Sequence, residues 1–257
     1  MSPNDGGPAP VAVIMGAGPD DAPRGLERIG ELADQSIEDV LARAEQFDIT
    51  GSTHGEMLEA VVAYDRDRLE QLVQQEIAAR GLSGFAREVV MPLAIEVGDL
   101  WALGKIPIAV EHLASEVVLH ALKAGLRTSR GSGPICVAAL LPHERHEWGF
   151  LCCLADVQEM GWQIHYLGAD LPPDEIVEVA WKRQAQAVAL SASDPANVEP
   201  LLASLAQLPG RLPPRAFAVI GGGGVAGHTR FLTSYGFRVG LESFALAGVG
   251  ATRDAVG

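Results

Sequence analysis

The stretch of residues 142–149 holds carboxylates, two histidines and a glycine directly after a run of apolar residues. Glu144 stands two residues before His146, so its carboxylate can accept the proton of one imidazole nitrogen and leave the other nitrogen free to bind a metal. Gly149 comes three residues after His146, where the absence of a side chain would let a bulky ligand approach. A loop histidine is by itself most often an ordinary surface residue, so the case for a metal site depends on the residues around it.

Small and polar residues follow three other short apolar runs. They are Gly168 and Leu171 after the second run, Ser191 and Ser193 after the third, and Gly221, Gly222 and Gly223 after the fourth. Glycines can bring the backbone close to a cofactor and offer amides to a phosphate, and serines are short hydrogen-bond donors. Each segment alone is also compatible with an ordinary turn, because a glycine run is weak evidence for a ligand.

A second group of residues lies in the first half of the chain. Trp101 precedes the pair Glu111 and His112 by ten positions, across the expected end of one helix, a turn and the start of the next helix. Two adjacent helix ends can present their side chains on one surface. The spacing alone fits equally well a tryptophan packed in the core and a histidine on a solvated face.

Short apolar runs alternate with amphipathic segments after residue 134. The runs are residues 135–141, 162–167, 187–191, 216–220 and 237–239. Strands that alternate with helices require right-handed crossovers and form a parallel sheet with helices on both faces. We therefore expect an α/β domain at residues 134–257, with a doubly wound, five-stranded parallel sheet of the flavodoxin or Rossmann type. Such sheets bind ligands beyond the carboxyl ends of their strands, where His146 and the small residues would lie.

Apolar residues recur at helical spacing in the preceding part of the chain. The pattern predicts helices at residues 26–44, 57–64, 69–79, 85–103 and 108–126, with short breaks between them. These helices would form an antiparallel bundle at residues 27–129. Residues 1–26 are rich in proline and glycine, and we expect them to be a flexible leader.

The composition limits the classes of protein to consider. With 48% hydrophobic residues among 257, the chain has enough apolar residues for a folded core. Its net charge of −14 disfavours direct binding of nucleic acid, because a phosphate backbone would be repelled. The sequence shows no export signal or membrane-spanning run and no paired set of cysteines, so we expect a cytoplasmic protein. Cys152 and Cys153 are expected to be packing residues.

Together, the motifs of the second half resemble the signature of cobalamin-binding domains. The matching positions are Glu144-x-His146-x-x-Gly149, then Ser191, then Gly221-Gly222, each at a strand end and in this order. The resemblance implies that His146 replaces the dimethylbenzimidazole base as the lower axial ligand of cobalt. It also implies that the displaced cofactor tail lies in a channel lined by residues 191–193 and 221–223.

The first half of the chain makes the resemblance more specific. With a cobalamin signature downstream, Trp101 followed by Glu111 and His112 resembles the light-sensing cobalamin proteins of the CarH and LitR type. In that family the bundle caps the upper face of adenosylcobalamin. The resemblance implies that Trp101 packs against the adenosyl group and that Glu111 and His112 contact or cover it. It also implies a sensor, not an enzyme, in which light breaks the cobalt–carbon bond and a conformational or oligomeric change follows.

The chain departs from the family pattern in several places. Glu144 stands where aspartate is usual and Ser193 where an apolar residue is common, and neither change removes a needed hydrogen-bonding group. Ala102 stands where the CarH pattern has a histidine that binds cobalt after illumination, so that route to a second histidine ligand is closed. We expect the leader to be too short and too acidic for the DNA-binding domain of CarH, so the expected output is a protein partner or a homo-oligomer.

Two other functions stay compatible with the sequence. A corrinoid carrier subunit of a methyltransferase pairs a similar bundle with a similar cobalamin domain, although it has no need of Trp101, Glu111 and His112. A dual photoreceptor would also hold a bilin such as biliverdin between the bundle and the cobalamin, in the space that Ala102 leaves, although no residue identifies a bilin site. If His146 is not the cobalt ligand, His143 is the next candidate.

Overall fold

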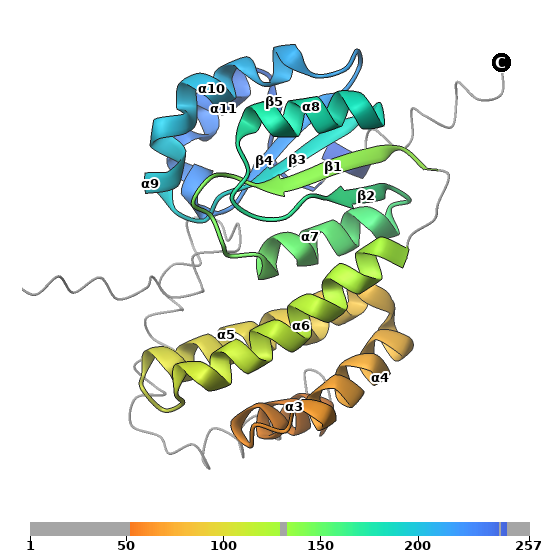
Figure 1. Ribbon diagram of the computed structural model, residues 1–257, viewed down its shortest axis with the longest axis vertical. Helices are drawn as coiled ribbons and strands as arrows, with labels where there is room; N and C mark the ends of the chain where they lie inside the picture. Colours follow the sequence, from red (N-terminus) through yellow and green to blue (C-terminus); the bar gives the residue numbers. More distant parts are fainter. Residues whose placement is uncertain (1–51, 129–132, 242, 246–257) are drawn as a thin grey trace, which may run out of the picture.

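The computed structural model describes residues 52–128, 133–241 and 243–245. The expected leader, the expected helix at 26–44 and the last residues of the expected α/β domain, 246–257, lie outside these residues. The first described part is a set of helices, shown from orange to yellow-green in Figure 1. They are α3 (Ser52–Val62), α4 (Arg66–Phe85), the π-helical turn η2 (Ala86–Val90), α5 (Met91–Ala102) and α6 (Ile108–Thr128).

Two residues explain where α4 begins and where it bends. Asp65 caps α4, because its side chain accepts a hydrogen bond from the backbone N–H of Arg68 at 3.0 Å. The sequence predicts a break at residues 81–83, and Gly81 does leave the helical region, with φ of 71° and ψ of 175°. Helical hydrogen bonding resumes directly after it, so the break is a kink inside one long helical segment instead of a loop.

The second described part is a parallel sheet. Its strands are β1 (Ile135–Leu140), β2 (Gln163–Tyr166), β3 (Ala187–Ser191), β4 (Phe217–Gly221) and β5 (Phe237–Arg238). Their order across the sheet is β2-β1-β3-β4-β5, and all neighbouring strands are parallel. This is the flavodoxin-type order, so the predicted fold class is confirmed. The order reverses direction between β1 and β3, which makes the crevice beyond their carboxyl ends the expected place for a ligand.

Helices cover both faces of this sheet (Figure 1). The elements between the strands are α7 (Trp148–Glu159), α8 (Pro173–Arg183), α9 (Pro195–Val198), η3 (Glu199–Leu201), α10 (Leu202–Gln207), η4 (Pro209–Arg211), η5 (Gly223–His228) and α11 (Thr229–Ser234). The segment at 195–207 forms three short helical pieces, α9, η3 and α10, and Pro200, which has no N–H to donate, lies in the middle piece. Among the described residues, no helix is long and apolar enough to cross a membrane.

The bundle packs against the face of the sheet that α7 covers, so both parts share one apolar core. A second core lies on the opposite face, between the sheet and α8, α10 and α11.

Cys152 on α7 is buried in the shared core, and its thiol lies 3.7 Å from the carbonyl oxygen of Ala86 in the bundle. Burial raises the pKa of Cys153 to about 11. Both observations fit the expected packing role of these cysteines.

Candidate functional site

The candidate site lies beyond the carboxyl ends of β1 and β3, at the point where the strand order reverses. The register pairs Leu140 with Ser191 and Ser191 with Gly221, so these three strands end at the same level. The loop that follows β1 carries residues 141–147, and the loop that follows β3 carries residues 192–194. Residues that are about 50 positions apart in sequence are thereby brought to one edge of the sheet.

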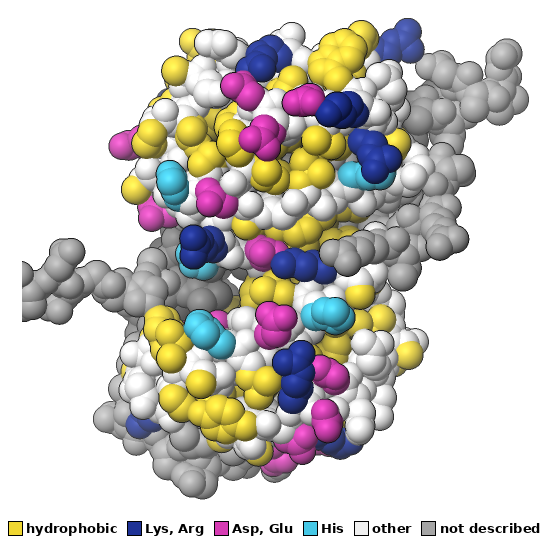
Figure 2. All heavy atoms as spheres, viewed as in Figure 1, with side chains coloured by type: hydrophobic (Ala, Val, Ile, Leu, Met, Phe, Trp, Pro, Cys, Tyr) yellow, Lys and Arg dark blue, Asp and Glu magenta, His cyan; other side chains and the backbone are white. Residues whose placement is uncertain are grey.

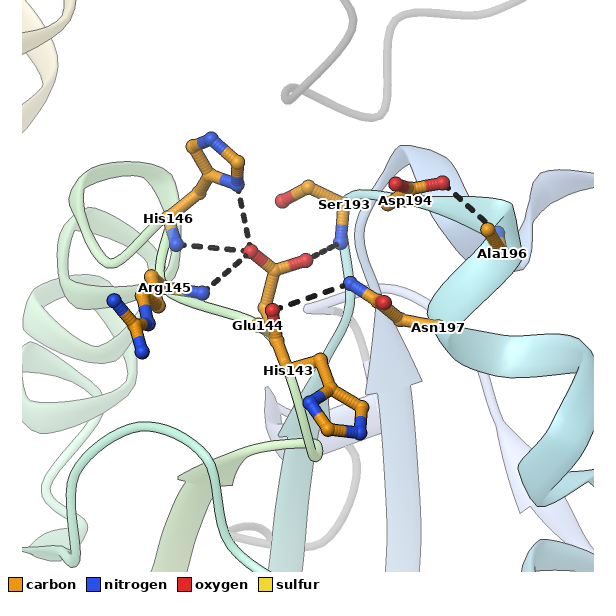
Figure 3. Close-up of polar contacts among 8 residues, drawn as sticks. All are labelled: His143, Glu144, Arg145, His146, Ser193, Asp194, Ala196 and Asn197. Carbon is orange, nitrogen blue, oxygen red and sulfur yellow. Dashed lines mark hydrogen bonds and ion pairs between the residues drawn. The ribbon is translucent and has the colours of Figure 1, made fainter. Parts of the chain in front are cut away.

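The carboxylate of Glu144 joins the two loops (Figure 3). The residue is fully buried, with 0% of its surface exposed. Its Oε1 accepts hydrogen bonds from the backbone N–H groups of Arg145 and His146, both at 2.9 Å, and lies 2.7 Å from Nδ1 of His146. Its Oε2 accepts the backbone N–H of Ser193. A buried carboxylate with four hydrogen-bonding partners is fixed in place, and it fixes the loops that donate to it.

The electrostatics of the pair favour a charged carboxylate beside a basic imidazole. Burial alone would raise the pKa of Glu144, but the hydrogen bonds from the His146 ring and from the backbone of His146 and Ser193 lower it to about 2. The same hydrogen bond raises the pKa of His146, against the effect of burial, and the negative charges of Glu144 and Asp194 add to the rise. Glu144 therefore holds the Nδ1 proton of His146 and increases the basicity of the ring.

His146 presents its other nitrogen to an incoming ligand. Its side chain is 60% exposed, although the carboxylate that holds it is buried. Nε2 has no hydrogen-bonding partner among the described residues, and Figure 3 shows it on the side of the ring that faces away from Glu144. A neutral imidazole held at Nδ1 by a carboxylate and free at Nε2 is the usual arrangement of a metal-binding histidine.

His143 is placed differently. Its backbone N–H donates to Oδ1 of Asp170 at 2.8 Å, and its carbonyl oxygen accepts from the side chain of Asn197 at 3.4 Å. Its φ of 65° turns the chain sharply, and in Figure 3 its ring points away from the ring of His146. The two histidines therefore do not form one site, and the geometry favours His146 over His143 as the ligand.

Ser193, Gly221 and Gly222 are the small residues at the same sheet edge as His146. The Oγ atom of Ser193 is buried and has no hydrogen-bonding partner among the described residues. At Gly222, which has φ of 95°, a Cβ atom would lie 2.2 Å from the carbonyl oxygen of Ala192. A Cβ at Gly221 would meet no atom within 4 Å, so this glycine borders open space. An unpartnered buried hydroxyl beside an open glycine fits a ligand with hydrogen-bonding groups, as a nucleotide-like cofactor tail has.

The other expected site residues of the sheet half lie at the same edge. Gly168 accepts the backbone N–H of Leu140 at 3.0 Å, and Leu171 donates to the carbonyl oxygen of Leu140 at 3.1 Å, so the turn after β2 is tied to the end of β1. Ser191 is 7% exposed at the end of β3. Gly149 is buried in the first turn of α7, and Gly223 begins η5.

The expected bundle residues lie at the turn between α5 and α6. Trp101 is half-buried and packs against the shared core at the end of α5. Glu111 is held on α6 by Ser115, whose Oγ donates to Oε1 at 2.7 Å, and by Nδ1 of His112, which lies 2.5 Å from Oε2. The His112 side chain is 70% exposed. None of the described hydrogen bonds or ion pairs joins these residues to the His146 loop. Trp101, Glu111 and His112 therefore lie near one another at the α5–α6 turn, without a described polar contact to the His146 loop.

Several residues that shape the site are not predicted by the sequence motifs. Asp194 caps α9 by accepting the N–H of Ala196 at 2.8 Å, and its charge acts on His146. The sequence Asp194-Pro195 is a common helix start and could have identified this cap. Lys123 of α6 forms an ion pair with Glu147, the residue that follows His146. No local pattern marks that pair, because its partners come from the two different halves of the chain.

Comparisons with known proteins give a family match in the bundle and a longer match along the chain. Residues 54–124, which lie in α3 to α6, match the model of a family described as the B12 binding domain. The chain is 29% identical over 179 residues to the HTH-type transcriptional repressor CarH of Myxococcus xanthus, a match that covers 67% of this chain and 58% of that protein.

A solved structure shares the fold. The monomethylamine corrinoid protein of Methanosarcina barkeri matches with a TM-score of 0.58 at 15% identity, over 79% of this chain and 98% of that chain. At this identity the likeness shows the fold alone. The family match and the sequence match confirm the resemblance inferred from the sequence: part of the helical bundle is similar to a B12 binding domain, and the chain is similar to CarH.

Proposed function

We propose that the chain is a light sensor that binds adenosylcobalamin in the base-off form, with His146 as the lower axial ligand of cobalt. The observation that carries the proposal is the free Nε2 of His146, which a buried carboxylate holds at the switch point of a parallel sheet. Similarity to CarH supports a sensor. When bound, adenosylcobalamin supplies a cobalt–carbon bond that visible light breaks.

The sheet half would hold the lower side of the cofactor. Glu144 keeps the proton on Nδ1 of His146, so that Nε2 can donate its lone pair to cobalt. Ser191, Ser193 and the glycines at 221–223 would line the channel for the displaced tail, and the unpartnered Oγ of Ser193 would find its hydrogen bond there.

The bundle would cover the upper side. Trp101 offers an aromatic surface for the adenosyl group, and Glu111 offers a carboxylate that Ser115 and His112 already orient. These contacts would exist in only one of the two states of the cofactor. A ligand shifts a conformational equilibrium only through such differential contacts, so the bundle would shift against the sheet after illumination.

The output would be a protein partner or a homo-oligomer of a cytoplasmic protein. The net charge of −14 disfavours a nucleic-acid surface on this chain. The chain spans 58% of the length of the CarH protein that it matches, so the output of that whole protein is not carried over.

Illumination tests the sensor directly. Protein loaded with adenosylcobalamin is divided into a dark sample and a sample exposed to visible light, and both are examined by absorbance and by size-exclusion chromatography with light scattering. We expect light to change both the absorbance and the hydrodynamic size. An absorbance spectrum that light leaves unchanged would refute photosensing.

A corrinoid carrier of a methyltransferase is the second candidate. The likeness in fold to a corrinoid protein, over nearly all of that protein, favours it as much as it favours a sensor. The two functions differ in the preferred cofactor, because a methyl carrier should bind methylcobalamin more tightly than adenosylcobalamin. Isothermal titration of the apoprotein with each cofactor in the dark separates them.

A bilin-containing sensor is the third candidate. Ala102 is exposed at the end of α5, where the family pattern has a histidine, and this leaves space above the corrin. Such a protein would hold biliverdin or a similar bilin between the bundle and the cobalamin. Expression with a source of biliverdin tests it, since a bound bilin would add a red absorbance band that cobalamin alone does not have.

A further inference from the structure

Glu147, the residue directly after His146, is joined to the bundle by an ion pair. Its Oε2 lies 2.5 Å from Nζ of Lys123, which belongs to α6. The two side chains are 15% and 32% exposed, so water screens this pair less than an ordinary surface pair. Figure 2 shows basic and acidic side chains where the two halves of the molecule meet, among charged side chains spread over this face.

Glu147 itself has a fixed position. Its carbonyl oxygen accepts the N–H of Leu151 at 2.9 Å, which places it at the start of α7. Tyr166 of β2 lies near its carboxylate: burial raises the pKa of Tyr166, and the charge of Glu147 raises it further. The side chain of Tyr166 also packs edge-on against Phe150 of α7, with ring centres 6.1 Å apart. A displacement of Glu147 would therefore move the end of the His146 loop with it.

In sequence, His146 thus lies between two glutamates whose carboxylates contact different parts of the molecule. Glu144, two residues before it, is tied to the β3 edge through the N–H of Ser193. Glu147, one residue after it, is tied to α6 through Lys123. Since Glu144 sets the ring from the sheet side, Glu147 is the residue through which the bundle can act on the same loop.

The other described polar contacts between the two halves lie farther along α7. Asp156 accepts from Ser83 and lies 3.3 Å from Nε of Arg87, and Gln158 donates to the carbonyl oxygen of Gly125 at 3.3 Å. At a rise of about 1.5 Å per helical residue, Asp156 is roughly 13 Å along the helix from Glu147. Among the described polar contacts, the Lys123–Glu147 pair is the one that reaches the His146 loop.

We propose that Lys123 and Glu147 are positioning residues that couple the location of α6 to the location of the His146 imidazole. A shift of α6 against the sheet either breaks this ion pair or pulls Glu147, and the adjacent histidine moves with it. The proposal rests on the proposed role of His146 as cobalt ligand, but it does not require that light drives the shift.

The test uses a double-mutant cycle of Lys123→Met, Glu147→Gln and the double variant, all in the full chain. Lys182→Met is the matched control, because it removes a lysine that pairs with Glu178 on α8, far from the loop in sequence, and both side chains there are largely exposed. The first readout is amide hydrogen exchange of residues 142–147 in the apoprotein. The second is the dark absorbance of adenosylcobalamin-loaded protein across pH, which reports the fraction of cofactor with histidine bound.

We expect Lys123→Met to speed exchange in the loop about two- to fivefold, the effect of losing an ion pair of this kind. The double variant should exchange no faster than the single variants, because both remove the same interaction. Loss of bound histidine on acidification should begin at a higher pH in Lys123→Met than in wild type. Lys182→Met should match wild type in both measurements.

Wild-type exchange in Lys123→Met, or additive effects in the double variant, would overturn the coupling. The coupling would also be wrong if the wild-type protein binds cobalamin base-off and Lys123→Met shows the same pH dependence of histidine binding as wild type. If instead the wild-type protein takes up cobalamin without losing its own base, the proposed role of His146 is wrong, and the coupling has no ligand on which to act. The dark spectrum of the wild-type protein distinguishes these two failures.

Discussion

The carboxylate of Glu144 is fully buried and lies 2.7 Å from Nδ1 of His146, whose own side chain is 60% exposed. The hydrogen bond to a buried carboxylate fixes the orientation of the exposed ring, so the ring can bind a large ligand in a defined orientation. The same carboxylate also accepts the backbone N–H of Ser193 at the end of the neighbouring strand. Glu144 therefore sets both the orientation of the expected cobalt ligand and the spacing of the two loops that surround it.

Glu144→Gln should destabilise the apoprotein. The amide has one acceptor oxygen in place of two, and its NH₂ group would face N–H donors, so at least one buried hydrogen bond is lost. Such a loss costs about 1–3 kcal/mol. Urea unfolding of the apoprotein at neutral pH measures the change. A variant as stable as wild type would show that the carboxylate does not hold the two loops together.

The stability of the apoprotein should depend on pH in two separate windows. The pKa of Glu144 is lowered to about 2, so its contribution is present above the unfolded value of about 4.3 and is lost as the pH falls toward 2. The pKa of His146 is raised, so its contribution is present below about 6.5 and is lost as the pH rises through the folded-state value.

An NMR titration of the histidine ring protons in the apoprotein checks the second window. The His146 signal, assigned by its loss in His146→Ala, should show a pKa raised above the ordinary histidine value of about 6.5 in wild type and shifted back toward that value in Glu144→Gln. A wild-type titration at or below that value would contradict the hydrogen-bonded pair.

Ser193→Ala should separate stability from cofactor binding. The buried Oγ of Ser193 has no partner among the described residues, and an unsatisfied buried polar group costs about 1–3 kcal/mol. Removing it should leave the apoprotein as stable as wild type or more stable, while the affinity for cobalamin falls. Thermal unfolding of the apoprotein and titration with cofactor measure the two effects. An apoprotein clearly destabilised by the change would show that the hydroxyl already has its partner in the fold.

The two neighbouring glycines should respond differently to alanine. Gly222 has φ of 95° and its Cβ would lie 2.2 Å from the carbonyl oxygen of Ala192, so Gly222→Ala should cost more than about 1 kcal/mol of folding free energy. Gly221 has open space around its Cβ position, so Gly221→Ala should fold normally and weaken cobalamin binding by obstructing the channel. If Gly221→Ala binds cobalamin as tightly as wild type does, the cofactor tail does not lie beside Gly221.

Much of the sheet half follows from sequence, because its signals are local. Short apolar runs lead into the His146 loop, into Ser191 and into Gly221, and a parallel sheet brings the carboxyl ends of its strands to one edge. The position of each loop in the site is thus fixed by topology alone. The same local signals predict a helix from residue 69, and α4 begins within a few residues of it, at Arg66.

The contacts that cross between segments could not be predicted in the same way. The bond from Ser193 to Glu144 spans 49 residues, and the Lys123–Glu147 pair joins two halves with different architectures. Residues 86–90 have an ordinary helical pattern, and their π-helical turn lies where the bundle packs against α7. Each of these features depends on how two elements pack, and no residue spacing within one segment encodes it.

The most direct test of the central claim records the absorbance of wild-type protein and of His146→Ala, each loaded with adenosylcobalamin, in the dark and after visible light. For wild type we predict a base-off spectrum in the dark and a clear change after light. For His146→Ala we predict that base-off binding is lost. Base-off binding that survives in His146→Ala, or a wild-type spectrum that light leaves unchanged, would contradict a light sensor built on His146.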